Sequence, residues 1–414
     1  MKNFKFSLLE LERKPFFSIL TIIQLIVSFV LIYMCLAFSN SVSNKVGVVD
    51  NIFNGKNYYT INSNNTNYLT EIDVDNIQEF MNMIDSRNID VYSVSTDSLP
   101  IKCSDISPDK IVGFGGEDNG YNQVKVIYVN SNYINNIGID LSEGEFNDSS
   151  YVPVILGEGY RNQFKIGDKI ESVRFDLNEN IVNETLIVTG FAKKGSLVCI
   201  NGSPDDLIEV DNYIIIQRDL DLKMKLKKYD DENKEMNEKI IIYNYLTNAY
   251  YDFKESGDIK KIEKSTSNSG LNFKFESNNE KIDEFIKENS TTLWQIRVFV
   301  IFILFFTIIS IIIVMINSIN DNSKEYGINM MVGASNKDIA CRILYQIIIL
   351  FSTSLAVALF IICRCICDDM YITMNFINVF ELIIICTVIC IFTCIIPSKK
   401  LKKISLNSIM KGSE

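Results

Sequence analysis

The sequence predicts an α-helical membrane protein with four transmembrane helices and a mixed α/β extracytoplasmic domain inserted between helices 1 and 2. Two observations predict this fold class: the chain contains four continuous apolar runs, and a long polar stretch separates the first two. Each run has 19–23 residues, and a helix of that length rises roughly 30 Å, the thickness of a bilayer core. The runs are Phe16–Phe38, Val298–Ile316, Ile343–Ile362 and Ile377–Ile396.

These runs divide the chain into membrane, external and internal segments. Phe4, Leu8 and Leu11 recur at helical spacing and predict a cytoplasmic amphipathic helix at 1–15 on the membrane surface, after which Pro15 marks the bend into the first span. The further predicted segments are transmembrane helix 1 at 16–38, the extracytoplasmic domain at 39–293, transmembrane helix 2 at 294–317, a cytoplasmic coupling loop at 318–342, transmembrane helix 3 at 343–365, an external loop at 366–376, transmembrane helix 4 at 377–397 and a cytoplasmic tail at 398–414.

The distribution of lysine and arginine predicts the orientation of the spans. Basic residues gather in the N-terminal segment, in the loop at 318–342 and in the tail, whereas the loop at 366–376 carries Asp368, Asp369 and no base. Short cytoplasmic loops carry the excess of basic residues in membrane proteins. We therefore expect a multi-pass protein of the cell membrane with both termini in the cytoplasm and the large domain outside.

The charge of the external domain limits its partners. Residues 39–293 hold 42 acidic and 26 basic residues, a net charge of −16, whereas the whole chain carries −11. Nucleic-acid binding needs a surplus of lysine and arginine to neutralise phosphates, so we expect no nucleic-acid partner. The excess of carboxylates would suit a cationic partner, or it could simply keep the domain soluble.

The cysteines give no indication of a metal site. Only Cys103 and Cys199 lie in the external domain, where oxidising conditions would permit a disulfide between them. The chain has no histidine and no C-x-x-C pair, so we expect no metal centre. Polar or small side chains at helical spacing in the spans predict faces that pack on neighbouring helices rather than a substrate path. These side chains are Ser18, Thr21, Gln24 and Ser28 in the first span, Thr307 and Ser310 in the second, and Cys386, Cys390 and Cys394 in the fourth.

The external domain combines short strand-like segments with fewer helical ones. A helix is predicted at Val74–Ser86, and Lys281–Asn289 is predicted to continue into the second span as one helix. Asp219–Glu238 is heavily charged and predicts an exposed helix or a linker. The predicted strands are Asn57–Asn62, Ile89–Val94, Val124–Val129, Val152–Leu156, Lys169–Arg174 and Thr185–Phe191, with weaker candidates at Val210–Ile216 and Lys239–Tyr245.

The loop after the second span is the most informative stretch of the sequence. Ile328, Met331 and Val332 share one face of a short predicted helix, and Gly333 can adopt the left-handed geometry that ends it. Ser335, with Asp338 three residues later, forms the pattern of a capping box that opens the next helix. The sequence therefore predicts an elbow, a short helix joined by a sharp turn to a membrane helix, that could transmit force from a cytoplasmic partner.

This loop resembles that of the FtsX/MacB/LolC-type ABC transporter permeases. Residues 139–191 are similar to the MacB-like extracytoplasmic core domain, and the basic tail after Pro397 resembles the family's terminal segment but lacks its usual proline near residue 406. In that family the loop docks on an ATP-binding subunit. The resemblance assigns ATPase coupling to Glu325, Gly327, Ile328, Gly333, Ala334, Ser335 and Ile339.

The chain has no G-x-x-x-x-G-K-[ST] phosphate loop, so ATP hydrolysis is expected on another polypeptide. The expected partners are an ABC ATP-binding subunit, a second permease copy in a homodimer or heterodimer, and the membrane. We expect no cofactor on this chain, with ATP and Mg on the partner ATPase.

Two charged residues lie close to the predicted membrane. Arg364 ends the third span and Glu381 begins the fourth, so a short loop would let them pair. Intramembrane charge is costly and can mark a functional site, but an interfacial pair whose long side chains reach the headgroups is the simpler interpretation.

The resemblance implies a permease that transmits ATP-driven motion to its external domain, for export or removal of peptides, antimicrobials or lipid-linked substrates. The alternative is an FtsX-like mechanosignalling regulator of cell-wall hydrolases that moves no substrate. A membrane-anchored enzyme is disfavoured, because no histidine is present to serve as a base and no activated nucleophile is evident.

Overall fold

The computed structural model describes residues 2–13, 15–62, 72–102, 121–146, 151–175, 181–229, 231–365 and 375–403. The chain forms two compact units. Unit 1 comprises Met1–Asn44 and Glu288–Glu414, and unit 2 comprises Lys45–Lys287. Two helices, α2 (Pro15–Ile52) and α7 (Asn278–Asp321), contribute residues to both units.

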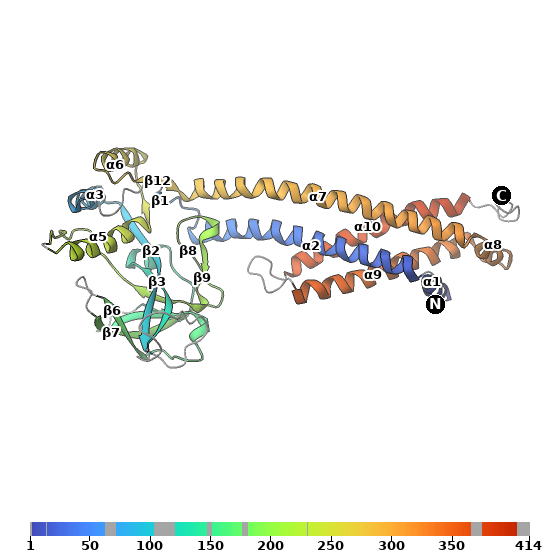
Figure 1. The fold of residues 1–414 in the computed structure, drawn as a ribbon, viewed down its shortest axis with the longest axis horizontal. Helices are drawn as coiled ribbons and strands as arrows, with labels where there is room; N and C mark the ends of the chain where they lie inside the picture. The colour runs from blue at the N-terminus through green and yellow to red at the C-terminus, as the bar shows by residue number, and fades with distance from the viewer. Residues whose placement is uncertain are drawn as a thin grey trace. The chain divides into compact units, whose positions relative to one another are not determined.

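Unit 1 is helical. Besides parts of α2 and α7 it contains α1 (Lys2–Glu12), α8 (Ser323–Met331), α9 (Asn336–Cys365) and α10 (Phe376–Lys403). Figure 1 shows α1, α8 and the last turns of α10 at the same end of this unit. Within the described ranges, four helices are long and apolar enough to cross a membrane, which confirms the predicted fold class; the stretches are Pro15–Ile52, Asn278–Asp321, Lys337–Arg364 and Phe376–Ile395.

Two of the four polar residues singled out in the first span, Gln24 and Ser28, lie against the second span. Ser28 Oγ is 2.8 Å from Thr307 Oγ1, and Ser310 Oγ donates to Gln24 Oε1 at 2.8 Å. Hydroxyl and amide groups in an apolar environment must find such partners, because leaving them unpaired is costly. These two contacts therefore tie α2 to α7. Cys386 is likewise buried, and Cys390 and Cys394 pack against the apolar core of unit 1.

Unit 2 is built on a ten-stranded mixed sheet in the order β12-β1-β11-β2-β3-β10-β5-β7-β4, with β6 pairing both β2 and β7. A separate two-stranded sheet joins β8 and β9. The strands are β1 (Tyr59–Asn62), β2 (Asp90–Lys102), β3 (Tyr121–Val129), β4 (Leu141–Gly144), β5 (Val152–Leu156), β6 (Lys169–Phe175), β7 (Ile181–Ala192), β8 (Leu197–Cys199), β9 (Leu207–Glu209), β10 (Ile214–Gln217), β11 (Ala249–Asp252) and β12 (Lys274–Ser277).

Three apolar clusters stabilise unit 2. One lies where α3 (Val74–Ser86), α5 (Glu232–Thr247) and α6 (Ser256–Asn268) gather at the β12-β1-β11 end of the sheet (Figure 1). A second lies between β2, β6, β7 and β10. The third includes Val49 and Phe53, at the end of α2, together with residues of β3, β8 and β10 and of the short helix α4 (Ser131–Asn136).

The structure corrects parts of the sequence interpretation of unit 2. Helix α3 matches its predicted range, but Lys239–Tyr245 is not a strand: it lies inside α5. Ile242 and Leu246, four residues apart, point into the same apolar cluster, and this spacing suits a helix rather than a strand. Within Asp219–Glu238, only the residues from Glu232 onward are helical. In Val210–Ile216, a single 3-10 turn at Val210–Asn212 precedes the strand that begins at Ile214.

Helix α2 also extends to Ile52, well past the predicted end of the first span at 38, and α7 begins at Asn278, ahead of the predicted second span at 294. The start of α7 is a capping box: Ser277 N donates to Glu280 Oε2 at 2.9 Å, and Glu280 N donates to Ser277 Oγ at 3.1 Å. Both helices therefore reach into the folded core of unit 2.

Asn278 joins the chain that follows α2 to the first residue of α7. Its Oδ1 accepts from Tyr58 N at 2.9 Å, its Nδ2 donates to Lys56 O at 3.2 Å, and its own N donates to Tyr58 O at 2.9 Å. Asn278 and Tyr58 are both buried. We call these three residues the Asn278 clamp.

We expect Asn278→Ala to loosen this clamp. The substitution leaves the buried Tyr58 N–H without an acceptor, which costs roughly 1–3 kcal/mol. Hydrogen exchange of the Tyr58 amide in the full-length protein should become roughly tenfold to hundredfold faster. The matched control is Asn279→Ala, because Asn279 is the exposed neighbour. Equal exchange rates at Tyr58 in the two variants would contradict this account.

Candidate functional site

The elbow predicted after the second span is present, and its turn is a Schellman motif. Helix α8 ends at Met331, and Gly333 has a φ of +103°. Gly333 N donates to Met330 O at 3.1 Å and Ala334 N donates to Asn329 O at 2.9 Å. These bonds satisfy the last carbonyl groups of α8, and the positive φ favours glycine at this position.

The predicted capping box opens α9 directly after this turn. Ser335 Oγ and Ser335 N lie 2.7 and 3.0 Å from Asp338 Oδ2, and Asp338 N donates to Ser335 Oγ at 3.2 Å. Only Ala334 separates the glycine that ends α8 from the serine that caps α9. The change of direction between the two helices is therefore fixed by local hydrogen bonds on both sides.

Helix α8 presents an apolar face that unit 1 does not cover. Ile328, Met331 and Val332 are 57%, 59% and 84% exposed. An exposed cluster of large apolar side chains on a short helix is typical of a protein interaction site. We call these three residues the α8 face.

The opposite side of α8 is held by a buried carboxylate on α1. Glu10 accepts from Tyr326 Oη at 3.1 Å and also from Gln346 Nε2 of α9. Burial raises the pKa of Glu10 above its ordinary value, although the Tyr326 hydrogen bond and the nearby Arg342 oppose this effect. Burial, followed by the Glu10 charge, raises the pKa of Tyr326 as well. Glu10 therefore links α1, α8 and α9.

Two further contacts fasten α1. Ser7 Oγ, which is buried, donates to Arg342 O at 2.8 Å, and the Arg342 guanidinium lies over the Phe6 ring at 4.5 Å. Arg13 and Glu325 form an exposed ion pair at 2.6 Å. Such surface pairs contribute little energy, about 0–1 kcal/mol, so the buried contacts dominate.

Helix α1 turns its polar residues toward the protein and exposes its apolar ones. Ser7 and Glu10 are buried in unit 1, whereas Phe4, Phe6 and Leu8 are exposed. This arrangement suits a helix whose outer face rests on lipid. It was not evident from the apolar spacing alone, which does not show what the polar face contacts.

The structure sorts the residues assigned to ATPase coupling into two groups. Ile328, Gly333 and Ser335 are exposed, and Glu325 pairs with Arg13. Gly327 and Ile339 are buried and Ala334 is half-buried, so the first two support the elbow from inside. The sequence analysis did not identify Glu10, Tyr326 and Gln346 as residues that contact one another. Glu10 was one polar residue in an amphipathic helix and Tyr326 was the neighbour of Glu325, and neither position indicated that the two side chains meet.

The remaining site predictions concern a charged pair and a disulfide. No ion pair joins Arg364 to Glu381 in the described part of the chain, and Arg364 is exposed. Asn40 Nδ2 instead lies 3.4 Å from Glu381 Oε2 and donates to Asn378 Oδ1 at 2.6 Å.

Cys103 lies outside the described residues, and Cys199 is a buried free thiol. Its Sγ donates to Ser203 O at 3.5 Å, and its carbonyl oxygen accepts from Tyr250 Oη at 2.8 Å. Burial raises the pKa of the Cys199 thiol from 9.0 to about 11. Among the described residues, no group of three or more histidine, cysteine, aspartate or glutamate side chains could hold a metal ion.

We expect Gly333→Ala to destabilise the turn, because a residue with a Cβ pays roughly 1–2 kcal/mol in left-handed backbone. Exchange of the Ala334 amide should become about fivefold to thirtyfold faster. Gly257→Ala in α6 is the control, since Gly257 lacks a positive φ and has open space around its Cβ position; it should not accelerate exchange. Unchanged protection at Ala334 in Gly333→Ala would refute the role of the turn.

We also expect Cys199 to resist alkylation in the folded protein. At about pH 8 a thiol with a pKa near 11 carries about a hundredfold less thiolate than one near 9. N-Ethylmaleimide followed by peptide mass spectrometry should label the exposed Cys341 first. Denaturant without reductant should then expose Cys199 to labelling. Protection that persists until a reductant is added would instead show a disulfide.

One comparison with known proteins covers the elbow. Residues 297–406 match the model of the FtsX-like permease C-terminal domain, a segment that contains α8, the turn and α9. Among solved structures, the extracellular domain of the noncanonic ABC-type transporter YknZ from Gram-positive bacteria is similar at 10% identity; the match covers 53% of this chain and 100% of that chain, with a TM-score of 0.27. No curated protein matches the sequence. Over this C-terminal segment, the chain is therefore similar to the FtsX-like permeases.

Proposed function

We propose that this protein is a permease subunit that transmits ATP-driven motion from a separate ATPase subunit to unit 2. The observation that carries the proposal is the α8 face. Ile328, Met331 and Val332 are exposed on a helix whose other side is fixed by Tyr326 and Glu10. A rigidly held apolar patch can receive a partner and pass on its displacement.

The partner that suits this face is the ABC ATP-binding subunit expected for the family. The apolar side chains of the α8 face would fill a hollow on that subunit, and the exposed Arg13–Glu325 pair would lie at its rim. ATP and Mg would be bound by the partner, because this chain has no phosphate loop. Two ATP-binding subunits would need two α8 faces, so we propose two permease copies, identical or different.

Helices α2 and α7 offer the route by which motion would leave the elbow. Helix α7 ends at Asp321, and α8 begins two residues later. The Ser28–Thr307 and Gln24–Ser310 contacts couple α7 to α2. Helix α2 ends in unit 2 and α7 begins there, and the Asn278 clamp joins the chain that follows α2 to the first residue of α7. A displacement of α8 would therefore act on unit 2 through paired helices.

The proposal does not need a polar channel. In the sequence of the four spans, aspartate, glutamate, lysine and arginine occur only near the ends, such as Arg297, Arg364 and Glu381. We propose that unit 2 lies outside the cell membrane, with both termini in the cytoplasm, and that its motion expels or hands on peptides, antimicrobials or lipid-linked substrates. The chain itself would catalyse no reaction.

Val332→Asp tests the docking step. The side chain is 84% exposed, so the substitution should not disturb folding, but a carboxylate buried in an apolar interface would weaken association with the ATPase subunit at least about tenfold. Co-purification and ATP hydrolysis by the reconstituted complex measure the effect. The control is Ile181→Asp, the same kind of change at a residue of unit 2 that is 67% exposed. If both variants assemble like the wild type, the α8 face is not the docking site.

A further inference from the structure

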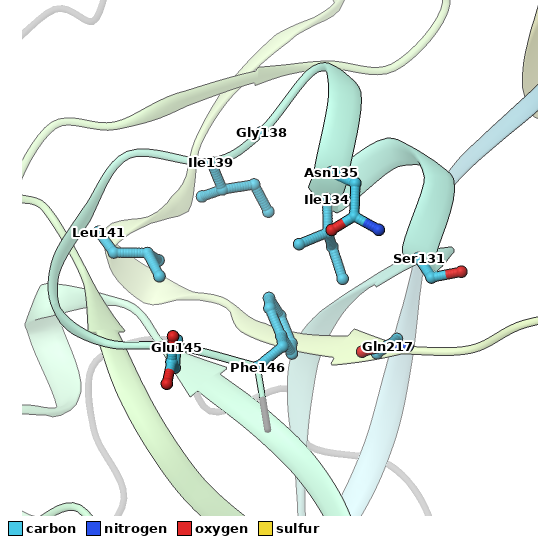
Figure 2. Close-up of a pocket in the computed structure, with 9 residues that line it drawn as sticks. All are labelled: Ser131, Ile134, Asn135, Gly138, Ile139, Leu141, Glu145, Phe146 and Gln217. Atoms are coloured by element: carbon cyan, nitrogen blue, oxygen red, sulfur yellow. The ribbon is translucent and has the colours of Figure 1, made fainter. Parts of the chain in front are cut away.

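Unit 2 contains a hollow with an apolar floor that the proposed function does not use. Its cavity volume is about 520 Å³, within the range of small-molecule sites. In Figure 2 the side chains of Ile134, Ile139, Leu141 and Phe146 converge on this space from α4, from the connection between α4 and β4, from the start of β4 and from the residues after β4. Each is half-buried, so the hollow is open to solvent on one side.

The floor is part of the folded core and not a loose surface loop. All four apolar residues pack against the cluster that includes Tyr133 and Val129. Helix α4 is capped by Asn130, whose Oδ1 accepts from Tyr133 N at 2.9 Å. The hollow is therefore held in shape by the same contacts that hold the sheet.

The polar groups around the hollow are acidic or neutral. Glu145, an exposed carboxylate, lines it together with Gln217 and Ser131, and none of the described residues that line it is basic. Asp219 lies directly behind: it accepts from Ser131 N and Oγ at 2.7 and 2.8 Å, and from Gln217 Nε2 at 2.9 Å. The hollow thus combines four apolar side chains with two nearby carboxylates.

Asp219 stays ionised at neutral pH. Burial alone would raise its pKa, but the hydrogen bonds from Gln217 and Ser131 outweigh burial and hold the pKa of this carboxyl below its ordinary value. Unit 2 as a whole also has a large excess of acidic residues. The local and the overall fields therefore both attract cations and repel anions.

We propose that this hollow binds an amphipathic cation, a molecule that carries an ammonium group on an apolar body. The apolar body lies on Ile134, Ile139, Leu141 and Phe146, and the ammonium group lies by Glu145, with Asp219 adding attraction from behind. The site needs neither an ATPase nor transport, so its test is independent of the proposed function.

Three probes of the same length test the charge preference: 4-phenylbutylamine, 4-phenylbutanol and 4-phenylbutanoate. Binding to the full-length protein in nanodiscs is measured by ligand-observed NMR, with empty nanodiscs to subtract partition into lipid. We expect the amine to bind about threefold more tightly than the alcohol, as for an exposed ion pair, and the carboxylate to bind most weakly. Equal binding of the three probes, or none by any of them, would overturn the proposal.

Two variants localise the site. Leu141→Lys places a competing ammonium group in the hollow and should reduce amine binding at least about tenfold. Glu145→Gln, at an exposed residue, should weaken only the amine, by about threefold, and leave the alcohol unchanged. Glu171→Gln is the control, because its carboxylate is exposed on β6 and pairs with Lys102. Amine binding that is unaffected by Leu141→Lys and Glu145→Gln, or lowered as much by Glu171→Gln, would place the cation elsewhere.

Discussion

The hydrogen bonds to Glu10 determine how α8 is presented. An exposed carboxylate can be hydrated by water at any position on a helix surface. A buried carboxylate instead needs hydrogen-bond donors from the protein at the place where it is buried. Glu10 takes its hydrogen bonds from Tyr326 and Gln346, on two different helices. Removing either donor would leave a buried acceptor partly unpaired, at a cost of about 1–3 kcal/mol. Helix α8 cannot rotate freely while this contact lasts, and its apolar face stays outward.

Hydrogen bonds also hold the other joints between the helices. The Schellman turn at Gly333 and the capping box at Ser335 fix the angle between α8 and α9. Hydroxyl and amide contacts tie α2 to α7, and the Asn278 clamp closes their far ends within unit 2. Each joint consists of directional hydrogen bonds; those of the Asn278 clamp and between Ser28 and Thr307 involve buried groups, whereas those of the elbow are exposed. Apolar packing surrounds these joints, but the hydrogen bonds set which residues must meet.

Much of the fold could be predicted from sequence, because its strongest determinants are local. Length and hydrophobicity located the four spans, and the spacing of Gly333, Ser335 and Asp338 gave both halves of the elbow. Periodicity gave α3 its full range. Lys239–Tyr245 was misassigned because a short run rich in isoleucine suits either a strand or a buried helix, and only the cluster it packs on decides.

The parts of the fold and of the candidate site that could not be predicted depend on contacts between residues far apart in the sequence. No pattern in α1 shows that Glu10 faces Tyr326, more than three hundred residues away, and no local signal places β12 beside β1 or Asn278 beside Tyr58. The exposed apolar residues of α8 were identifiable as one helical face, but their exposure required the fold. The hollow in unit 2 is likewise formed by α4, β10 and the segment around β4, which the sequence does not bring together.

The claim that motion at the elbow reaches unit 2 is tested most directly by hydrogen exchange on the permease–ATPase complex, with and without a non-hydrolysable ATP analogue. The account predicts that the nucleotide changes exchange both at the amides of Val332–Ala334 and at those of Tyr58 and Asn278. Changes confined to the ATPase and the elbow, with Tyr58 and Asn278 unaffected, would contradict it.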